Sequence, residues 1–255
     1  MDARHPTPPV IEPPTVPAER LYRMAPETYH GLIEHGLIAP QEIALVDGLL
    51  VQGSECDGPS EPSDRLYRMP LDVYHRVADA GLLGPGDKTE LLDGLLLKKM
   101  TKGDPHIIAT HLTRDALAAA VPGGWFVLKE DPVALPTGPS RYASEPEPDL
   151  AVVRGAIRDY LGHKPKPEDV ALIVEVAETS LRWDRSKLTR YAWANVPVAW
   201  IVNLNDRVVE VYSNPTGPVA PARYQDVTTY GPDDHAPVVV DGREVGRVAV
   251  AGLLP

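Results

Sequence analysis

Two carboxylates in apolar stretches are the residues of this chain most suited to chemistry. Asp149 follows Pro148 at the start of the stretch LAVV, and Glu175 lies in the middle of ALIVEVA. A carboxylate in so apolar a run is costly to bury unless a cation or donor pairs with it. If the two stretches are neighbouring strands, the acids converge, and a divalent cation relieves their repulsion. The pattern therefore predicts a Mg²⁺ site, with Mn²⁺ as a substitute.

A lysine and a further acid extend this candidate site. Lys187 follows Glu175 by twelve residues, on an expected helix. Its flexible stem reaches toward the acids, where an ammonium orients an attacking water or stabilises charge on phosphorane oxygens. Glu90 lies in TELLDGLL, just before an Asp-Gly pair.

Each of these residues also has a structural reading. Pro-Asp is a common turn dipeptide, which would account for Asp149 alone. The structural alternative for Glu175 is an acid paired with Arg or Lys, although a carboxylate inside an apolar strand favours a functional role. The structural alternative for Glu90 is a solvated strand residue. Asp184 and Lys187 lie three apart on one helix, so a surface ion pair explains them about as well as catalysis does. His106 is read first as a helix-start residue and second as a catalytic one.

The elements that must position these residues alternate between strands and helices. Apolar spacing predicts a helix over residues 106–121 and another from about Ser180. Strand-like runs are WFVLKEDPVAL, PDLAVVRG, DVALIVEVAE, AWIVNL and RVVEVYS, and short valine-rich strands follow from Tyr224. The pattern indicates an α/β (α+β) fold with a mixed central sheet flanked by helices.

An internal repeat precedes this region. The segment RLYRMAPETYHGLIEHGLIAPQEIALVDGLLV begins at Arg20 and matches RLYRMPLDVYHRVADAGLLGPGDKTELLDGLLL, which begins at Arg65. Each copy is predicted to form a short helix and an Asp-Gly hairpin. Glu90 of the second copy corresponds to Ala44 of the first. We therefore expect a disordered Pro-rich tail (1–18), a first copy (19–53), a linker (54–64), and a domain over 65–255 whose residues 65–100 are the second copy.

The amino-acid composition excludes several classes of protein. The 255 residues are 43% hydrophobic and carry one cysteine, Cys56, so we expect a globular cytoplasmic protein without disulfides. No apolar stretch approaches a membrane span, and six prolines replace the apolar core of a secretory signal in the first twenty residues. The net charge is −11, of which residues 1–64 hold 3 Lys and Arg against 11 Asp and Glu. Contact with DNA must therefore rely on local basic patches or a bound cation.

The combined motifs resemble the PD-(D/E)XK nuclease superfamily and, within it, the Uma-two family of restriction endonucleases. The resemblance rests on TELLDGLLLKKM with His106 after it, on EPEPDLAVV, and on LIVEVAETSLRWDRSKLTRYAWANVPVAWIV. It implies a restriction-endonuclease-like fold and a Mg²⁺-dependent endonuclease acting on DNA, in which the lysine has migrated to the helix. The catalytic residues that it implies are Glu90, Asp149, Glu175 and Lys187, with Asp184 as the helix acid and with Glu90, Asp149 and Glu175 as metal ligands.

The chain departs from the family pattern at several positions. Glu178 replaces a usual Ser, Val198-Ala199-Trp200 replaces Glu-Tyr-Trp, and Asn203 stands where Asp is common. The first repeat copy lies outside the usual family architecture. An alternative is therefore a catalytically inactive nuclease-fold module for nucleic-acid or protein interaction. A third hypothesis is that the first copy is a regulatory lid that covers the site in cis, with an excess of acidic residues that mimics a phosphate backbone. Many nucleases cut both strands as symmetric dimers, so a homodimer is also expected.

Overall fold

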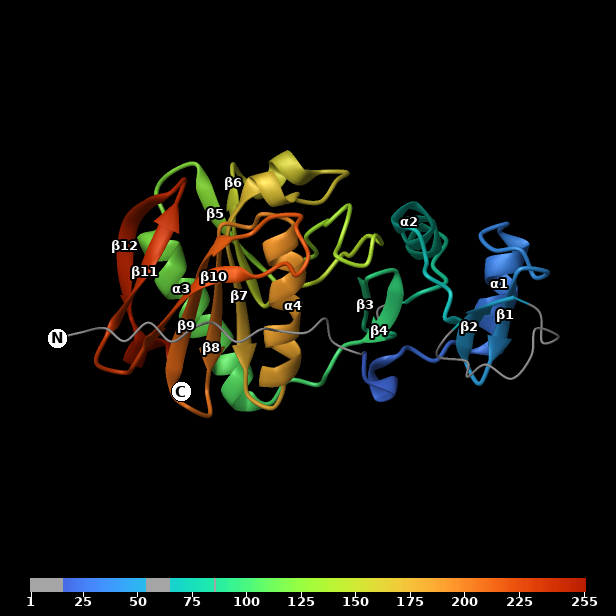
Figure 1. Ribbon diagram of the computed structural model, residues 1–255, viewed down its shortest axis with the longest axis horizontal. Helices are drawn as coiled ribbons and strands as arrows, with labels where there is room; N and C mark the ends of the chain where they lie inside the picture. The colour runs from blue at the N-terminus through green and yellow to red at the C-terminus, as the bar shows by residue number, and fades with distance from the viewer. Residues whose placement is uncertain (1–15, 54–64, 85) are drawn as a thin grey trace. The chain divides into compact units, whose positions relative to one another are not determined.

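A computed structural model describes residues 16–53, 65–84 and 86–255 (Figure 1). The expected Pro-rich tail lies almost wholly, and the expected linker wholly, outside these residues. The described chain divides into two compact units. We call Thr101–Pro139 with Glu147–Pro255 the core unit, and the described residues up to Met100 with Ser140–Pro146 the repeat unit.

The core unit is built on a six-stranded mixed sheet with the strand order β10-β9-β8-β7-β6-β5. Only β7 and β8 are parallel, and the other neighbours in this sheet are antiparallel. A separate hairpin pairs β11 with β12. The strands are β5 (Trp125–Lys129), β6 (Leu150–Arg154), β7 (Val170–Ala177), β8 (Val198–Asn203), β9 (Val208–Pro215), β10 (Tyr224–Tyr230), β11 (His235–Val240) and β12 (Arg243–Ala249).

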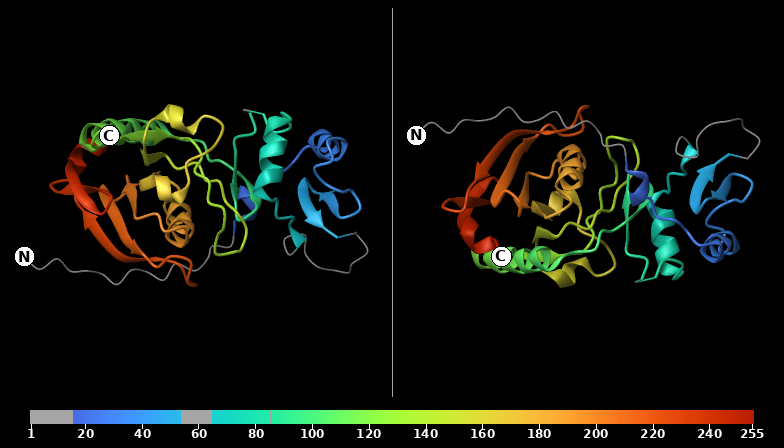
Figure 2. Two further views of the ribbon diagram at one scale, coloured as in Figure 1. Left: turned by 90° about the horizontal axis from the view of Figure 1, so that it is seen from above. Right: turned by 90° about the horizontal axis from the view of Figure 1, so that it is seen from below.

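Two long helices cover opposite faces of this sheet (Figure 2). Helix α3 (Asp104–Ala120) packs with the β11–β12 hairpin on one face, through residues such as Ala109 and Leu117. Helix α4 (Leu181–Trp193) packs on the other face through Leu188 and Tyr191. Both faces of β7 are therefore buried along its whole length. Short 3₁₀ turns complete the unit: η3 (Ile157–Tyr160), η4 (Pro167–Asp169) and η5 (Val250–Leu253).

The local elements confirm the predictions made from periodicity. Helix α3 begins two residues before the predicted start, because Pro105 in its first turn needs no hydrogen-bond partner there. The predicted helix from about Ser180 is α4, which begins at Leu181. The strand-like runs form β5 to β9, and the α+β class with a mixed central sheet is observed.

The repeat unit holds both copies of the repeat. The first contributes α1 (Pro26–Glu34), β1 (Ile43–Val46) and β2 (Leu49–Gln52), and the second contributes α2 (Leu71–Asp79), β3 (Thr89–Leu92) and β4 (Leu95–Lys98). A 3₁₀ turn, η1 (Ala18–Arg20), precedes the first copy.

Each Asp-Gly pair joins a two-stranded hairpin, as predicted. Asp47 and Gly48 have φ of 48° and 77°, and Asp93 and Gly94 have 51° and 73°. These values are typical of the tight turns that favour Asp-Gly. The second copy thus lies in one compact unit with the first. In the described part of the chain, no helix has the length and apolar character needed to cross a membrane.

Candidate active site

The sheet register brings Asp149 and Glu175 to neighbouring positions. Strands β6 and β7 are antiparallel with Leu150 opposite Val174, so the preceding Asp149 stands opposite Glu175. Directly opposed residues of an antiparallel pair have Cβ atoms about 5 Å apart on the same face. The backbone N–H of Val176 donates to Oδ2 of Asp149 at 2.7 Å, which fixes this carboxylate against β7. Two acids from separate segments therefore share the sheet face covered by α4.

Glu175 is held by two side chains of α4. Glu175 is 2% exposed. The Nζ of Lys187 lies 3.4 Å from Oε1, and the hydroxyl of Tyr191 donates to the same oxygen at 2.6 Å. Burial raises the pKa of Glu175 to about 8, and the negative charges of Asp184 and Asp149 act in the same direction, against Lys187 and Tyr191. The carboxyl group thus lies where additional positive charge would stabilise its ionised form.

Asp149 lies among donors on the other side of the pair. The Nζ of Lys102 is 2.7 Å from Oδ1, and Nε2 of His106 is 3.2 Å from Oδ2. Burial by itself would raise the pKa of Asp149, but the hydrogen bond and charge of His106, together with Lys102, hold it well below its usual range. Lys102 also contacts Oε1 of Glu130 at 2.9 Å. Asp149 is therefore ionised at neutral pH, beside a carboxyl group with the opposite pKa shift.

Asp184 is a third buried acid in this neighbourhood. It lies in the first turn of α4 and accepts a hydrogen bond from the hydroxyl of Ser180. Burial raises the pKa of Asp184 to about 6, and the charge of Asp149 adds to this, while Lys187 and Ser180 oppose it. Asp184 is 5% exposed, so the reading of Asp184 and Lys187 as a surface ion pair does not describe them.

Glu90 belongs to the repeat unit, where it lies on β3 and is 3% exposed. Its Oε1 is 3.6 Å from the guanidinium of Arg20. Of the four residues expected to act together, the structure thus brings Asp149, Glu175 and Lys187 together within the core unit.

Lys102 and Tyr191 contact the two acids but were not among the site residues predicted from the sequence. Tyr191 follows Lys187 by one helical turn, so the face of α4 that carries Lys187 was a usable signal. Lys102 lies just before the start of α3, where no periodicity marks it. His106, given a secondary role from the sequence, contacts Asp149 directly.

The donor set of this site suits a hard divalent cation. Among the described residues, no group of three or more His, Cys, Asp or Glu side chains is arranged to hold a metal. Magnesium, however, is commonly held by one or two carboxylates, with waters and substrate phosphate oxygens as its other ligands. Asp149 and Glu175 supply these two carboxylates, and the raised pKa of Glu175 reflects charge that a cation would offset.

The chain is similar to a known protein family and to a solved structure. A family model described as "Uma2: Putative restriction endonuclease" matches residues 71–242, a span that includes most of the second repeat copy. A solved structure similar to the chain is that of a "putative nuclease belonging to DUF820" from Anabaena variabilis, with 13% identity and a TM-score of 0.48. The similarity covers 65% of this chain and 88% of that one. No curated protein matches the sequence.

Proposed function

This chain belongs to the Uma2 family, and from that premise we propose that it is a Mg²⁺-dependent endonuclease that hydrolyses phosphodiester bonds of DNA. The observation that carries the proposal is the meeting of Asp149 and Glu175 on one sheet face, with the Lys187 amine 3.4 Å from Glu175. Two acids and an amine around one point can hold a divalent ion and offset the charge that develops during phosphodiester hydrolysis. The single cysteine supports a reducing, cytoplasmic location.

Asp149 and Glu175 would hold the metal. When bound, a divalent ion supplies a Lewis acid for the phosphate oxygens and lowers the pKa of water in its coordination shell. Manganese, which also favours oxygen ligands, would substitute for magnesium.

The protein's own groups carry the remaining steps. Lys187 orients the attacking water and offsets the negative charge that develops on the phosphate oxygens. Tyr191 fixes one oxygen of Glu175 by its hydrogen bond. His106 is a positioning residue, since it acts on the substrate through the carboxylate of Asp149. The ammonium of Lys102 contacts Oδ1 of the same carboxylate and competes with the ion for it.

We retain Glu90 in the proposal as an additional ligand or as a group that orients a metal-bound water. Its support is the motif TELLDGLL within the matched family region. Glu90→Gln is the variant that examines this role.

The test is nicking of supercoiled plasmid with Mg²⁺ or Mn²⁺ by the wild type and by Asp149→Ala. A matched control is Asp115→Ala, which alters an exposed acid of α3 that pairs with Arg114. We expect nicking by the wild type and the control only, and no nicking in the presence of EDTA. Equal activity of the wild type and Asp149→Ala would remove the proposal.

A second candidate is a nuclease-fold module without catalytic activity. It is favoured by the contacts of Asp149, whose two carboxylate oxygens already accept protein donors from Lys102, His106 and the backbone of Val176. Titration calorimetry separates the two functions. An absence of heat on adding millimolar Mg²⁺ or Mn²⁺ to the wild type favours the inactive module.

A further inference from the structure

The two repeat copies exchange their N-terminal arms within the repeat unit. We call residues 20–24 the first arm and residues 65–69 the second arm. The N–H of Tyr22 in the first arm donates to the carbonyl of Leu96 in β4 at 2.9 Å. The N–H of Tyr67 in the second arm donates to the carbonyl of Leu50 in β2 at 2.8 Å. Each arm therefore pairs with the hairpin of the other copy, at equivalent positions.

Each arm then returns to its own hairpin, again in the same way. The N–H of Met24 donates to the carbonyl of Gly48, and that of Met69 donates to Gly94, both at 2.7 Å. A Cβ added to Gly48 or Gly94 would lie about 3 Å from the arm of the same copy. The same set of contacts therefore occurs twice, once for each arm. The two copies are related as the subunits of an isologous dimer are, by an approximate two-fold axis.

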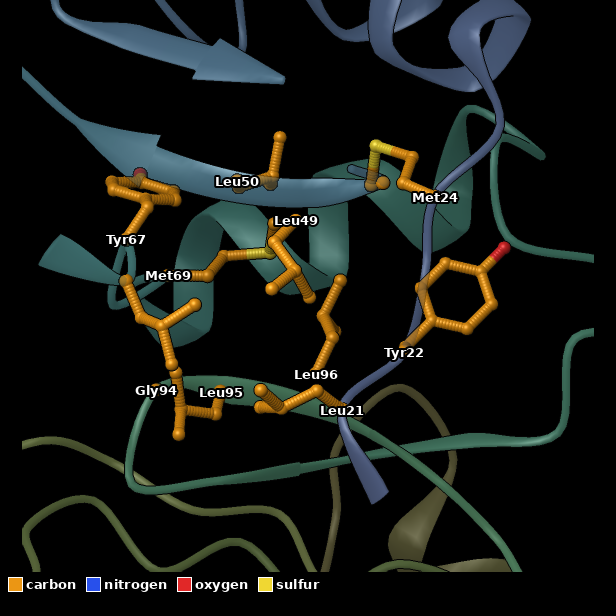
Figure 3. A pocket seen from close by; sticks show the side chains of 12 residues that line it. Leu21, Tyr22, Met24, Leu49, Leu50, Tyr67, Met69, Gly94, Leu95 and Leu96 are labelled. Atoms are coloured by element: carbon orange, nitrogen blue, oxygen red, sulfur yellow. The ribbon is translucent and has the colours of Figure 1, made fainter. Parts of the chain in front are cut away.

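A small apolar cavity lies where the copies meet (Figure 3). Its lining consists of six residues of the first copy and the six equivalent residues of the second, for example Tyr22 with Tyr67 and Leu49 with Leu95. Its volume of ≈30 Å³ leaves room for little more than one or two waters. We therefore interpret it as the junction of a symmetric interface and not as a ligand site.

The copies also share one hydrophobic core. Residues from both copies form a single buried cluster: Met24, Leu32, Leu37, Ile38 and Ile43 from the first copy, with Met69, Val77 and Leu91 from the second. Separating the copies would expose this apolar surface to water, so each copy needs a partner of the same shape.

The polar contacts across the interface reveal which copy carries the complete surface. From the first arm, Tyr22 donates to Asp87 at 2.7 Å, and Arg20 lies 3.6 Å from Glu90. The second arm carries the same donors, Arg65 and Tyr67, at the equivalent positions.

The first copy lacks the two acids, since Gln41 and Ala44 stand at the equivalent positions. The second copy therefore has both an arm of this type and the acidic groups that bind one. Its interface is complementary to itself.

We propose that the first repeat copy (residues 20–51) is an internal substitute for a second protein chain. It occupies the surface through which the second copy (residues 65–97) would otherwise pair with the second copy of another chain. The full chain is accordingly a monomer at this interface, with one core unit per assembly. This inference rests on contacts within the repeat unit, and Glu90 is the residue that it shares with the proposed nuclease function.

Two features favour the internal partner. Because both copies belong to one chain, their encounter occurs at a high effective concentration. In addition, Gly31 of α1 allows a close approach to Leu82, since a Cβ there would lie 2.5 Å from Cδ2 of Leu82. The equivalent residue of the second copy is Arg76. The end of the Leu82 side chain would have to move in a pair of second copies, which gives the first copy an advantage.

The first experiment disables the first copy in the full-length chain. The double variant Leu21→Asp and Leu49→Asp introduces two charges into the apolar junction from the side of the first copy. We expect the mass measured by light scattering to double from the monomeric 27.7 kDa, because the released surface of the second copy pairs between chains. Adding Leu66→Asp, the equivalent change in the second arm, should restore the monomer.

The second experiment tests self-complementarity without requiring dimer formation. In the full-length chain, residues 20–51 are replaced by the sequence of residues 65–97. We expect a monomer with the wild-type helix content and a cooperative thermal transition. The proposal is overturned if this chain loses the repeat unit or polymerises, or if the double variant stays monomeric at every concentration.

Discussion

The amine of Lys187 lies 3.4 Å from the carboxylate of Glu175, although the two residues belong to different elements, α4 and β7. Both side chains are almost completely buried. A buried amine next to a buried acid is retained at a cost, because desolvation opposes both charges. Asp149 lies beside this pair. The Glu175–Lys187 pair can therefore take part in catalysis as well as in packing.

Replacing Lys187 should abolish nicking while leaving the fold intact. Lys187→Met keeps most of the side-chain volume but removes the charge, and Glu175 can remain protonated within the variant. We expect plasmid nicking to fall by about 100-fold or more, as happens when one electrostatic stabiliser of a transition state is lost. The measure is the initial nicking rate, with the thermal midpoint as the check on folding. Lys164→Met, at an exposed lysine, is the matched control, and comparable losses in both variants would contradict the assigned role.

Replacing Lys102 should strengthen metal binding. Its ammonium contacts Oδ1 of Asp149 and so competes with a cation for the same carboxylate. Lys102→Ala removes one positive charge from the site, and at solvent-like dielectric this corresponds to about 1 kcal/mol, or a roughly fivefold to tenfold lower Kd for Mg²⁺. Titration calorimetry on the variant and the wild type measures this change. Weaker binding in the variant would instead make Lys102 part of the support for the metal site.

The stability of the core unit should depend on Glu210 in acid. Buried Glu210 on β9 accepts hydrogen bonds from Arg185 and Tyr212. Burial opposes ionisation, but these donors and Asn203 lower the pKa of Glu210 overall. A lowered pKa stabilises the folded state above the unfolded-state pKa, about 4.3, and this contribution disappears as the pH falls through the folded-state value.

Thermal melting from pH 7 to pH 3 examines this dependence. The wild type should lose more of its stability over that range than Glu210→Gln does. Exposed Glu244→Gln is the control, and it should follow the wild type. Parallel curves for the wild type and Glu210→Gln would contradict the assignment.

The packing of Gly31 should appear as coupling with Leu82. An alanine in the interior of a helix is usually more favourable than glycine by about 0.5–1 kcal/mol. In the wild type that gain is opposed, because the new Cβ meets Cδ2 of Leu82. We expect Gly31→Ala to raise the free energy of unfolding more in a Leu82→Ala background than in the wild type. A double-mutant cycle by denaturant unfolding gives the coupling energy, and a value near zero would show that the two residues are independent.

Much of the fold could be predicted from local patterns. The helices α3 and α4, the strands β5 to β9 and the two Asp-Gly hairpins appear where periodicity and turn chemistry indicated them. Such patterns depend on residues within a few positions of one another, and burial of one face is sufficient to produce them.

The contacts within the candidate site were harder to predict from the sequence than the fold was. Asp149 and Glu175 were found because a carboxylate in an apolar strand is conspicuous, whereas Lys102 lies in a polar stretch with no such contrast. The pairing of each repeat arm with the hairpin of the other copy could not be predicted either, since both copies have the same local pattern whichever hairpin the arm joins.

By itself, the sequence determined which segments form helices and strands, where the repeat lies, and which acids and lysine are candidates for catalysis. These features depend on side-chain type and on spacing over short distances along the chain. Only the tertiary structure decided that Leu150 pairs with Val174, which sets Asp149 opposite Glu175, and that α4 places Lys187 and Tyr191 over them. Strand register and helix docking arise from contacts between distant segments. A shift of one residue would turn every side chain of a strand to the other face, so only the packed core could select the arrangement.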